Sequence, residues 1–428
     1  MARQESNTSI TRPLPLWSYS ASDHTKWVRE SYPEMVSSNA TVDFIDFPYR
    51  YVAVSKNEQA LRLAQNLANG GGLDYYLIGR IDQHEDRTGE AAVKQMFHFH
   101  YENESEFKGL TSIAEVALLK GTDGNVKEFR GWFRLLTEHH LLFDTIHVDA
   151  MPSRLSSYKT IIIPDYEALP AILCEKLDQF VEAGGLIISS GRTAFRNESY
   201  EPLTSPQLAC LGVERIRMAR KGMRSAYIKR PNDNDDSIAD LFYLERLYVY
   251  AEYKKAVIKQ FKLIPPHPYG PPERCYYTDV NDNEPGYAIH SYGKGASIYI
   301  PWLPGELFYE HGYENTFHFI QYLLTEEARL VPIKGDISPL IQVTLAKQEG
   351  MGRSFLLQLV NHSGHTGVSY HAPLKAENVT IRIPNITHLP GQVTSLTTGQ
   401  AQAFGLEKEG LEINVSELNG YEAIKIEG

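Results

Sequence analysis

The spacing of hydrophobic residues changes once along this chain, near residue 335. Before that point, short apolar runs alternate with stretches whose apolar residues recur at helical spacing, which indicates strands alternating with helices. After it, short runs of alternating apolar and polar residues recur, at residues 355–360, 379–383, 411–415 and 423–426. The change predicts an α/β region followed by a small antiparallel β-sandwich.

The first 120 residues favour strand–helix–strand units. Gly70, Gly71 and Gly72 follow a run with helical spacing, and glycine often ends a helix in this way. A strand, a helix and a second strand at this spacing form a βαβ unit with a parallel strand pair. Strands are predicted at residues 14–20, 41–47 and 73–78, and helices at residues 57–68 and 90–101.

Residues 125–330 repeat the alternation with more apolar strands. The segment KTIIIP, residues 159–164, is short and apolar enough to be a buried parallel strand. The next predicted helix carries Leu173, Leu177 and Val181 on one side. This alternation is typical of a doubly wound, flavodoxin-like α/β domain. Helices are predicted at residues 126–142, 171–183 and 314–326, and further strands at residues 145–148, 186–190 and 297–301.

The charge of the chain argues against one class of partner. The 428 residues include 42 Lys and Arg against 53 Asp and Glu, a net charge of −11, so no nucleic-acid partner is expected. No apolar run approaches the ~20 residues that span a bilayer, so no membrane is expected either. The first residues, MARQESNTSITRP, lack the apolar core of a signal peptide. The expected compartment is therefore the cytoplasm.

The cysteine and histidine patterns favour neither disulfides nor metal. Cys174, Cys210 and Cys275 are the three cysteines, and an odd, widely spaced set fits neither a disulfide framework nor a zinc site. The stretch from His84 to Asp86 would need a ligand from elsewhere in the chain and is interpreted as a solvated loop. We therefore expect no metal and no cofactor.

Several segments resemble the β-galactosidases of glycoside hydrolase family 42 and their bacterial relatives. VDFIDFPYR (residues 42–50) and GGGLDYYLIGRID (residues 70–82) resemble the last two strands of that family's barrel. The most specific segments lie in the middle of the chain: EFRGWFRLLTEHHLLFDTI (128–146), YKTIIIPDYEALP (158–170), LDQFVEAGGLIISSGRTAF (177–195) and GASIYIPWLPGELFYEHG (295–312).

The resemblance implies three domains. Residues 1–120 would form the end of a (β/α)8 barrel. Residues 121–332 would form a trimerisation domain with the fold of a class I glutamine amidotransferase, and residues 333–428 a small β-sandwich. The implied partners are a carbohydrate and two further copies of the chain in a homotrimer.

The resemblance also implies site residues. In the family, the earlier of the two barrel strands carries the catalytic nucleophile, a Glu, at its C-terminal end, and Asp46 is the nearest equivalent. Arg80 stands where the family has an active-site arginine. Arg50, Tyr76 and Trp17 are the other candidate substrate-binding residues. The alternative for Asp46 is a structural carboxylate paired with Arg50 or Arg80, and for Arg80 a barrel-closing ion pair.

Three functions stay open at this point. The chain is the C-terminal part of a carbohydrate-cleaving enzyme, a catalytically inactive carbohydrate-binding or scaffold protein, or an enzyme of another class. A full barrel takes ~250 residues, and the family's acid/base residue lies on an earlier strand than those found here. We therefore expect no glycosidase activity from the chain alone, and a separate polypeptide or a second copy covering the open strand edge.

The middle domain is interpreted as a scaffold. Glutamine hydrolysis needs a cysteine at a strand-to-helix elbow, whereas Cys174 falls inside a predicted helix, so the domain is not expected to be a glutaminase. Four aromatic residues are either anchors of the trimer interface or core residues: Trp132, Trp302, Phe308 and Tyr309.

Overall fold

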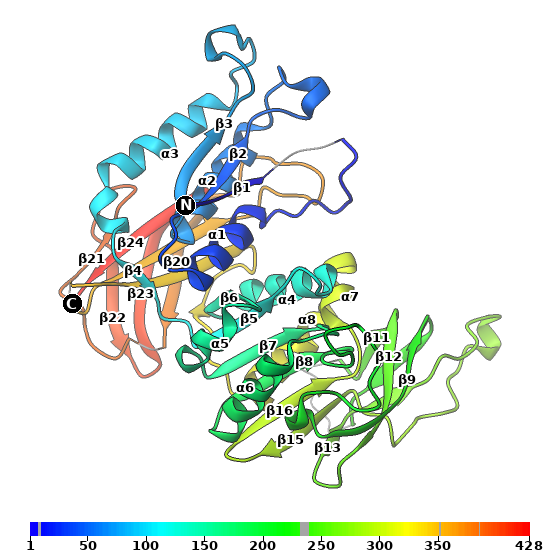
Figure 1. Cartoon of the computed structure of the whole chain (residues 1–428). Coiled ribbons are helices and arrows are strands. Elements are labelled where there is room, and N and C mark those ends of the chain that lie inside the picture. The colour runs from blue at the N-terminus through cyan, green and yellow to red at the C-terminus, as the bar shows by residue number, and fades with distance from the viewer. Residues whose placement is uncertain (7–9, 232–238, 351, 385) are drawn as a thin grey trace. The chain divides into compact units, whose positions relative to one another are not determined.

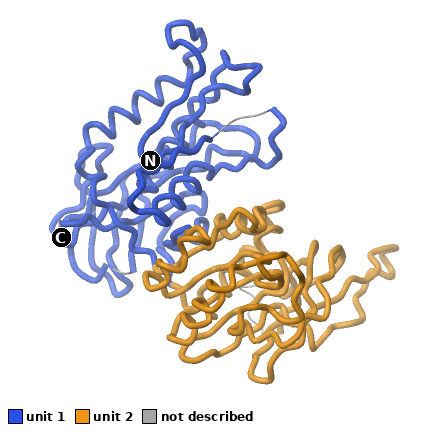
Figure 2. Tube along the Cα trace, viewed as in Figure 1, with its two compact units in different colours: residues 1–114, 137–145, 331–428 blue, residues 115–136, 146–330 orange. Residues whose placement is uncertain are grey.

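The computed structural model describes residues 1–6, 10–231, 239–350, 352–384 and 386–428. It divides into two compact units (Figure 2). Unit 1 contains residues 1–114, 137–145 and 331–428, and unit 2 contains residues 115–136 and 146–330. The two ends of the chain therefore belong to the same unit, and unit 2 is inserted between them.

Unit 1 begins with a three-stranded parallel sheet (Figure 1). Strand β2 lies between β1 and β3, and each strand leads into a helix, as in βαβ units. The elements are β1 (Ala2–Ser6), α1 (Ser20–Ser31), β2 (Ser37–Val42), α2 (Lys56–Ala68), β3 (Gly72–Tyr76) and α3 (Glu90–Glu102).

One face of this sheet packs on helices through polar side chains. Ser6 of β1 hydrogen-bonds Ser20 of α1 at 2.8 Å, and Asn39 of β2 hydrogen-bonds His24 of α1, also at 2.8 Å. Ser6 and Asn39 are buried, so these bonds offset the cost of removing the polar groups from water. Because side chains alternate along a strand, the neighbouring residues of β1 and β2 point to the opposite face.

The C-terminal part of unit 1 forms two antiparallel sheets, with strand orders β17-β20-β23-β22 and β21-β24-β19-β18-β4. Leu359 of one sheet and Ile413 of the other belong to one hydrophobic cluster, the arrangement of a β-sandwich. The strands are β4 (Leu110–Ser112), β17 (Lys334–Gly335), β18 (Ile341–Gln348), β19 (Phe355–Asn361), β20 (Ala376–Ile383), β21 (Gln392–Ser395), β22 (Ala403–Glu407), β23 (Gly410–Leu418) and β24 (Tyr421–Glu427).

Unit 2 is built around a sheet with strand order β13-β15-β16-β8-β7-β5-β6. Strands β16, β8, β7 and β5 run parallel, and β15 and β13 extend the sheet in antiparallel fashion. The strands are β5 (Val116–Lys120), β6 (Phe143–His147), β7 (Thr160–Pro164), β8 (Leu186–Ser190), β13 (Ile258–Gln260), β15 (Tyr287–Tyr292) and β16 (Gly295–Ile300).

Among the described residues of unit 2, the other elements include five α-helices and two smaller groups of strands. The helices are α4 (Val126–Glu138), α5 (Met151–Arg154), α6 (Ala171–Glu182), α7 (Pro304–His311) and α8 (Glu314–Tyr322). Strands β9 (Val213–Lys221) and β12 (Leu247–Tyr253) pair with each other, and β10 (Ala226–Lys229) lies between β11 (Leu241–Leu244) and β14 (Lys262–Ile264). Among the described residues, no helix combines the length and apolarity needed to cross a membrane.

The structure corrects one predicted strand. Residues 14–19 are irregular and Ser20 begins α1, so the strand predicted at residues 14–20 is wrong. The strand that pairs with β2 is instead Ala2–Ser6, whose sequence ARQES is polar and shows no strand pattern. Its conformation depends on parallel pairing with β2, a contact between distant residues that no local pattern encodes.

Candidate functional site

The face of the three-stranded sheet away from α1 carries a charged cluster. Arg3 of β1 donates two hydrogen bonds to Asp74 of β3, Nε to Oδ2 at 2.6 Å and Nη2 to Oδ1 at 3.3 Å. The same guanidinium donates to Glu5 at 3.2 Å and lies 5.3 Å from the ring centre of Tyr76. Ser38 of β2 donates to Asp74 at 3.3 Å. The hydrogen bonds to Asp74 raise the pKa of Arg3, as expected for a bidentate ion pair.

Asp46, the candidate nucleophile, lies in a loop. Strand β2 ends at Val42, earlier than the predicted end at residue 47. The Asp46 carboxylate accepts hydrogen bonds from the backbone N–H groups of Phe47 at 2.7 Å and Ile10 at 3.2 Å, and it caps the 3-10 helix η1 (Phe47–Tyr49). These contacts account for an aspartate at this position without a catalytic role, and the nucleophile assignment stays a prediction.

The two candidate arginines lie in exposed loops. Arg80 follows the end of β3 and forms an ion pair with Asp82, with 2.6 Å between Nη2 and Oδ2. Arg50 follows η1, and its guanidinium carbon lies 5.1 Å from the ring centre of Tyr51. Each arginine therefore contacts a near neighbour in sequence.

Tyr76 and Trp17 lie in different surroundings. Tyr76 is the last residue of β3, and the structure brings it into the charged cluster beside Arg3. Trp17 precedes α1, and its ring centre lies 5.4 Å from that of Tyr19. Their roles in substrate binding remain predictions.

Asp43 is the carboxylate that directly follows β2. It is buried and accepts hydrogen bonds from the Val54 backbone N–H at 3.1 Å and from the Tyr75 hydroxyl at 2.5 Å. Burial and this carboxylate raise the pKa of Tyr75. Asp43 therefore fastens β2 to β3 and to the segment before α2. A carboxylate directly after the last apolar residue of a strand was the sequence signal for this position.

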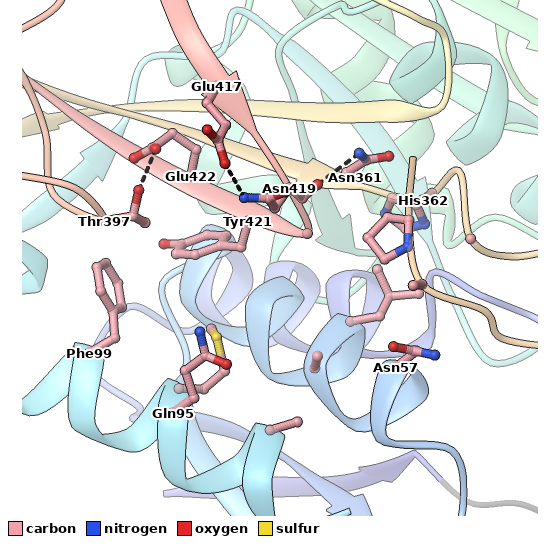
Figure 3. Close-up of a pocket in the computed structure, with 18 of the residues that line it drawn as sticks. Asn57, Gln95, Phe99, Asn361, His362, Thr397, Glu417, Asn419, Tyr421 and Glu422 are labelled. Atoms are coloured by element: carbon pink, nitrogen blue, oxygen red, sulfur yellow. Dashed lines mark hydrogen bonds between the residues drawn. The ribbon is translucent and has the colours of Figure 1, made fainter. Parts of the chain in front are cut away.

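A separate cavity of about 660 Å³ lies between helices α2 and α3 and the C-terminal strands (Figure 3). Asn57 of α2 and Gln95 and Phe99 of α3 line one side, and Tyr421 at the start of β24 and His362 after β19 line the other. This volume lies in the range of ~300–1,000 Å³ that is usual for small-molecule sites. The lining contains no residue of β1, β2 or β3, so the cavity is distinct from the charged cluster.

Metal ligands do not gather at either place. Within the described ranges, no group of three or more His, Cys, Asp or Glu side chains is arranged to hold a metal ion. The charged cluster is instead held together by the Arg3 guanidinium, which occupies the position that a cation would take beside Asp74.

Comparison with known protein families finds a match for one part of the chain. Residues 99–215 match the family of the β-galactosidase trimerisation domain. This match begins within α3 and ends within β9. Among curated proteins, none matches the sequence significantly.

Solved structures share the fold of nearly the whole chain. α-L-Fucosidase isoenzyme 2 from Paenibacillus thiaminolyticus is 17% identical with a TM-score of 0.75, over 94% of this chain and 62% of that chain. β-Galactosidase from Bacillus circulans sp. alkalophilus is 14% identical with a TM-score of 0.70, over 99% and 60%. A catalytic mutant of a family 42 β-galactosidase from G. stearothermophilus is 14% identical with a TM-score of 0.68, over 99% and 59%.

These findings confirm the resemblance to the C-terminal portion of family 42 β-galactosidases. The family match supplies the trimerisation domain, and the structural likeness, at such low identity, supplies the fold alone. The chain spans about three fifths of the length of these solved structures: the match covers 62%, 60% and 59% of their chains.

The segment that matches the trimerisation domain contains a buried glutamate in unit 2. Glu128 of α4 accepts hydrogen bonds from Trp132 Nε1 at 2.9 Å, Ser190 Oγ at 2.7 Å and the Glu306 backbone N–H at 2.6 Å. Burial raises the pKa of Glu128 to about 8, so the carboxyl group is largely protonated at neutral pH. Partners reach both oxygens, and the Ser190 hydroxyl is the one that can also accept the proton of the neutral acid, which makes this a structural network.

The elbow after β7 carries an acid where a glutaminase would need a thiol. Asp165 follows the strand with a φ of 44° and accepts hydrogen bonds from Arg192 and Asn125. Cys174 lies on α6, and burial raises its pKa to about 12, so it remains a neutral thiol rather than a nucleophilic thiolate. The elbow after β7 therefore carries no cysteine, and the interpretation of this domain as a scaffold stays a prediction.

The four aromatic residues considered as interface anchors belong to the core of the single chain. Trp132 and Trp302 are fully buried, and Phe308 and Tyr309 are nearly so. Their burial within one chain favours the core alternative over the anchor alternative for these four residues, and the homotrimer stays a prediction.

Proposed function

We propose that this chain is the assembly and barrel-end portion of a glycoside hydrolase related to the family 42 β-galactosidases, with unit 2 holding copies together. The observation that carries the proposal is the match of residues 99–215 to the trimerisation domain, preceded in the chain by parallel strand–helix units. Names of structural neighbours include β-galactosidases and an α-L-fucosidase, which supports a carbohydrate as the ligand.

The charged cluster is the proposed carbohydrate-contacting part of this sheet. An ion pair such as Arg3–Asp74 offers donors and acceptors at fixed positions to sugar hydroxyls, and the Tyr76 ring offers an apolar face. The loops that follow β2 and β3 of the same sheet carry Asp46, Arg50 and Arg80. Loops after the strands form the active sites of barrel enzymes.

The two edge strands of the three-stranded sheet, β1 and β3, offer places where further strands can pair. In the part of the chain that the structure describes, β1 and β3 each pair with β2 only. Unpaired strand edges are templates for pairing with another chain. We therefore include in the proposal a separate polypeptide, or a second copy, that covers these edges.

A catalytically inactive scaffold or carbohydrate-binding protein is the second candidate function. It is favoured by the capping contacts of Asp46 and by the ion pair that holds Asp74. Both candidates share the assembly role and differ in hydrolysis.

Light scattering on the purified chain tests the assembly role. We expect a mass three times the 48.5 kDa of the chain at micromolar concentration, unchanged by the exposed substitution Tyr101→Ala on α3. A monomer mass at all accessible concentrations would contradict the proposal.

A further inference from the structure

The cavity between α2, α3 and the C-terminal strands has chemistry that the proposed function does not use. It lies within unit 1, and its lining shares no residue with the charged cluster of β1 and β3. Whatever binds there therefore binds at a second surface.

The charges at the cavity argue against an ionic ligand. Its described lining includes no Lys or Arg, so an anion would find no fixed cation. The Glu417 carboxylate is already held by Lys375 at 3.0 Å and by Asn419 at 2.6 Å. Glu422 accepts hydrogen bonds from the Ser395 hydroxyl at 3.0 Å and from the hydroxyl of Thr397. The third acid of the lining is Glu102, whose Oε1 lies 3.2 Å from Nε2 of His98. Since all three acids have partners, a cation would gain little, and a neutral ligand fits best.

His362 provides a buried hydrogen-bonding atom in this lining. The side chain is 3% exposed, and Nδ1 has no hydrogen-bond partner among the described residues. The amide of Gln65 has a defined orientation, because its oxygen accepts from the Ser22 backbone N–H at 3.2 Å and its nitrogen donates to Ser18 O at 2.7 Å. That nitrogen also lies 3.5 Å from His362 Nε2.

The orientation of Gln65 determines which His362 nitrogen carries the proton. Because the Gln65 nitrogen is a donor, Nε2 accepts, and the proton of the neutral ring lies on Nδ1. Burial lowers the pKa of His362 to about 3, so the ring stays neutral at ordinary pH. His362 Nδ1–H is therefore a buried donor in need of an acceptor, such as a ligand hydroxyl.

The helix side adds amides and a ring. Asn57 and Gln95 face the cavity from α2 and α3 (Figure 3), and each amide offers both donors and an acceptor, which suits hydroxyl groups that donate and accept at once. The rings of Phe99 and Tyr421 meet edge to face, with centres 5.7 Å apart, and form an apolar wall. Amides beside an aromatic wall match the polar edge and apolar face of a pyranose.

We propose that this cavity binds a neutral saccharide, with Asn57, Gln95 and His362 contacting hydroxyl groups and Phe99 and Tyr421 contacting the ring face. The inference goes beyond the proposed function, because it places a carbohydrate outside the sheet face that would belong to a barrel active site.

Calorimetric titration of the full chain with lactose tests the proposal. We expect wild type to bind, and the double variant Asn57→Ala/Gln95→Ala to bind about tenfold more weakly or worse, since several hydroxyl contacts are lost. The matched control is Lys94→Ala/Tyr101→Ala, two exposed changes on α3 outside the lining, which should keep wild-type affinity. Thermal unfolding by circular dichroism shows that the variants remain folded.

Two outcomes would overturn the inference. One is the absence of lactose binding to wild type at the highest soluble concentration. The other is equal affinity of wild type and the Asn57→Ala/Gln95→Ala variant. If Tyr76→Ala abolishes binding in that second case, the sugar occupies the charged cluster, which favours the proposed function while rejecting the cavity. The trimer mass tests the assembly role independently of either result.

Discussion

Glu58 and Arg62 form an ion pair one helical turn apart in α2, with 2.6 Å between Glu58 Oε1 and Arg62 Nη2 and both side chains almost fully buried. Arg62 also donates to Val42 O at 3.4 Å. In water such a pair contributes little, whereas in a buried site each charge depends on its partner. The free energy of unfolding should therefore depend strongly on each residue of this pair.

Arg62→Met should lower the free energy of unfolding by about 3–5 kcal/mol, because it leaves the Glu58 carboxylate buried without its main cation. Urea unfolding followed by circular dichroism measures the change. Lys94→Met is the matched control, since Lys94 forms the same type of pair with Glu90 but is 76% exposed, and it should cost less than about 1 kcal/mol. Equal costs for the two substitutions would refute this account.

The raised pKa of Glu128 predicts that the free energy of unfolding depends on pH. Its folded pKa of about 8 lies above the 4.5 of an exposed glutamic acid, so the folded state keeps a proton that the unfolded state releases. The contribution of Glu128 to the free energy of unfolding should therefore be greatest below about pH 5, fall up to about pH 8 with a slope of at most ~1.4 kcal/mol per unit, and level off above it.

Urea midpoints measured between about pH 5 and pH 9 test this linkage. The slope should be shallower in Glu128→Gln, whose side chain has no proton to lose in that window. Comparing slopes removes the contribution of all other titrating groups, which both proteins share. Indistinguishable slopes would mean that Glu128 titrates normally.

At the scale of elements, helices α4 and α7 of unit 2 approach each other through glycine. A methyl group added at Gly131 of α4 would collide with the backbone carbonyl of Gly305 at the start of α7, and one added at Gly305 would meet Glu128. This close approach brings Glu128 within 2.6 Å of the Glu306 backbone N–H. The buried acid therefore depends on how two helices pack.

Gly131→Ala should destabilise unit 2 by about 1–3 kcal/mol, although alanine favours a helix over glycine by about 1 kcal/mol. The backbone of α7 cannot yield as a flexible side chain would. Gly405→Ala in β22, where a methyl group meets nothing within 4 Å, should change stability by less than about 0.5 kcal/mol. Thermal unfolding compares the two variants, and a neutral Gly131→Ala would mean that the helices can separate at little cost.

At the scale of the whole molecule, the carboxylates near the charged cluster bear on hydrolysis. Retaining glycosidases need two carboxyl groups ~5–5.5 Å apart, one of them able to donate a proton. Arg3 holds both Asp74 and Glu5 in ion pairs, so each of these carboxylates already has a cationic partner. Asp43 is buried and accepts a hydrogen bond from the Tyr75 hydroxyl.

The purified chain should therefore not hydrolyse nitrophenyl β-galactoside, as measured by release of nitrophenolate. Activity should require further strands paired at the edges of β1 and β3, each of which pairs only with β2 among the described residues. Turnover by the single chain that disappears in Asp46→Asn would reject this prediction while confirming Asp46 as a site residue.

The local spacing of apolar residues in the sequence determined those elements that depend mainly on residues close together in the chain. Helix α2 and strands β7 and β8 lie where the sequence predicted them, because helical spacing and short apolar runs are properties of consecutive residues. The resemblance to the trimerisation domain also came from the sequence, since its segments are contiguous.

Tertiary structure alone decided the rest. Strand β1 has a polar sequence and exists through its pairing with β2, and β4 joins a sheet whose other strands come from the C-terminal region. The Arg3–Asp74 pair, the Asp43–Tyr75 bond and the cavity beside Tyr421 join residues far apart in the chain. Such contacts depend on how whole elements pack, and the spacing of residues within one element carries no record of them.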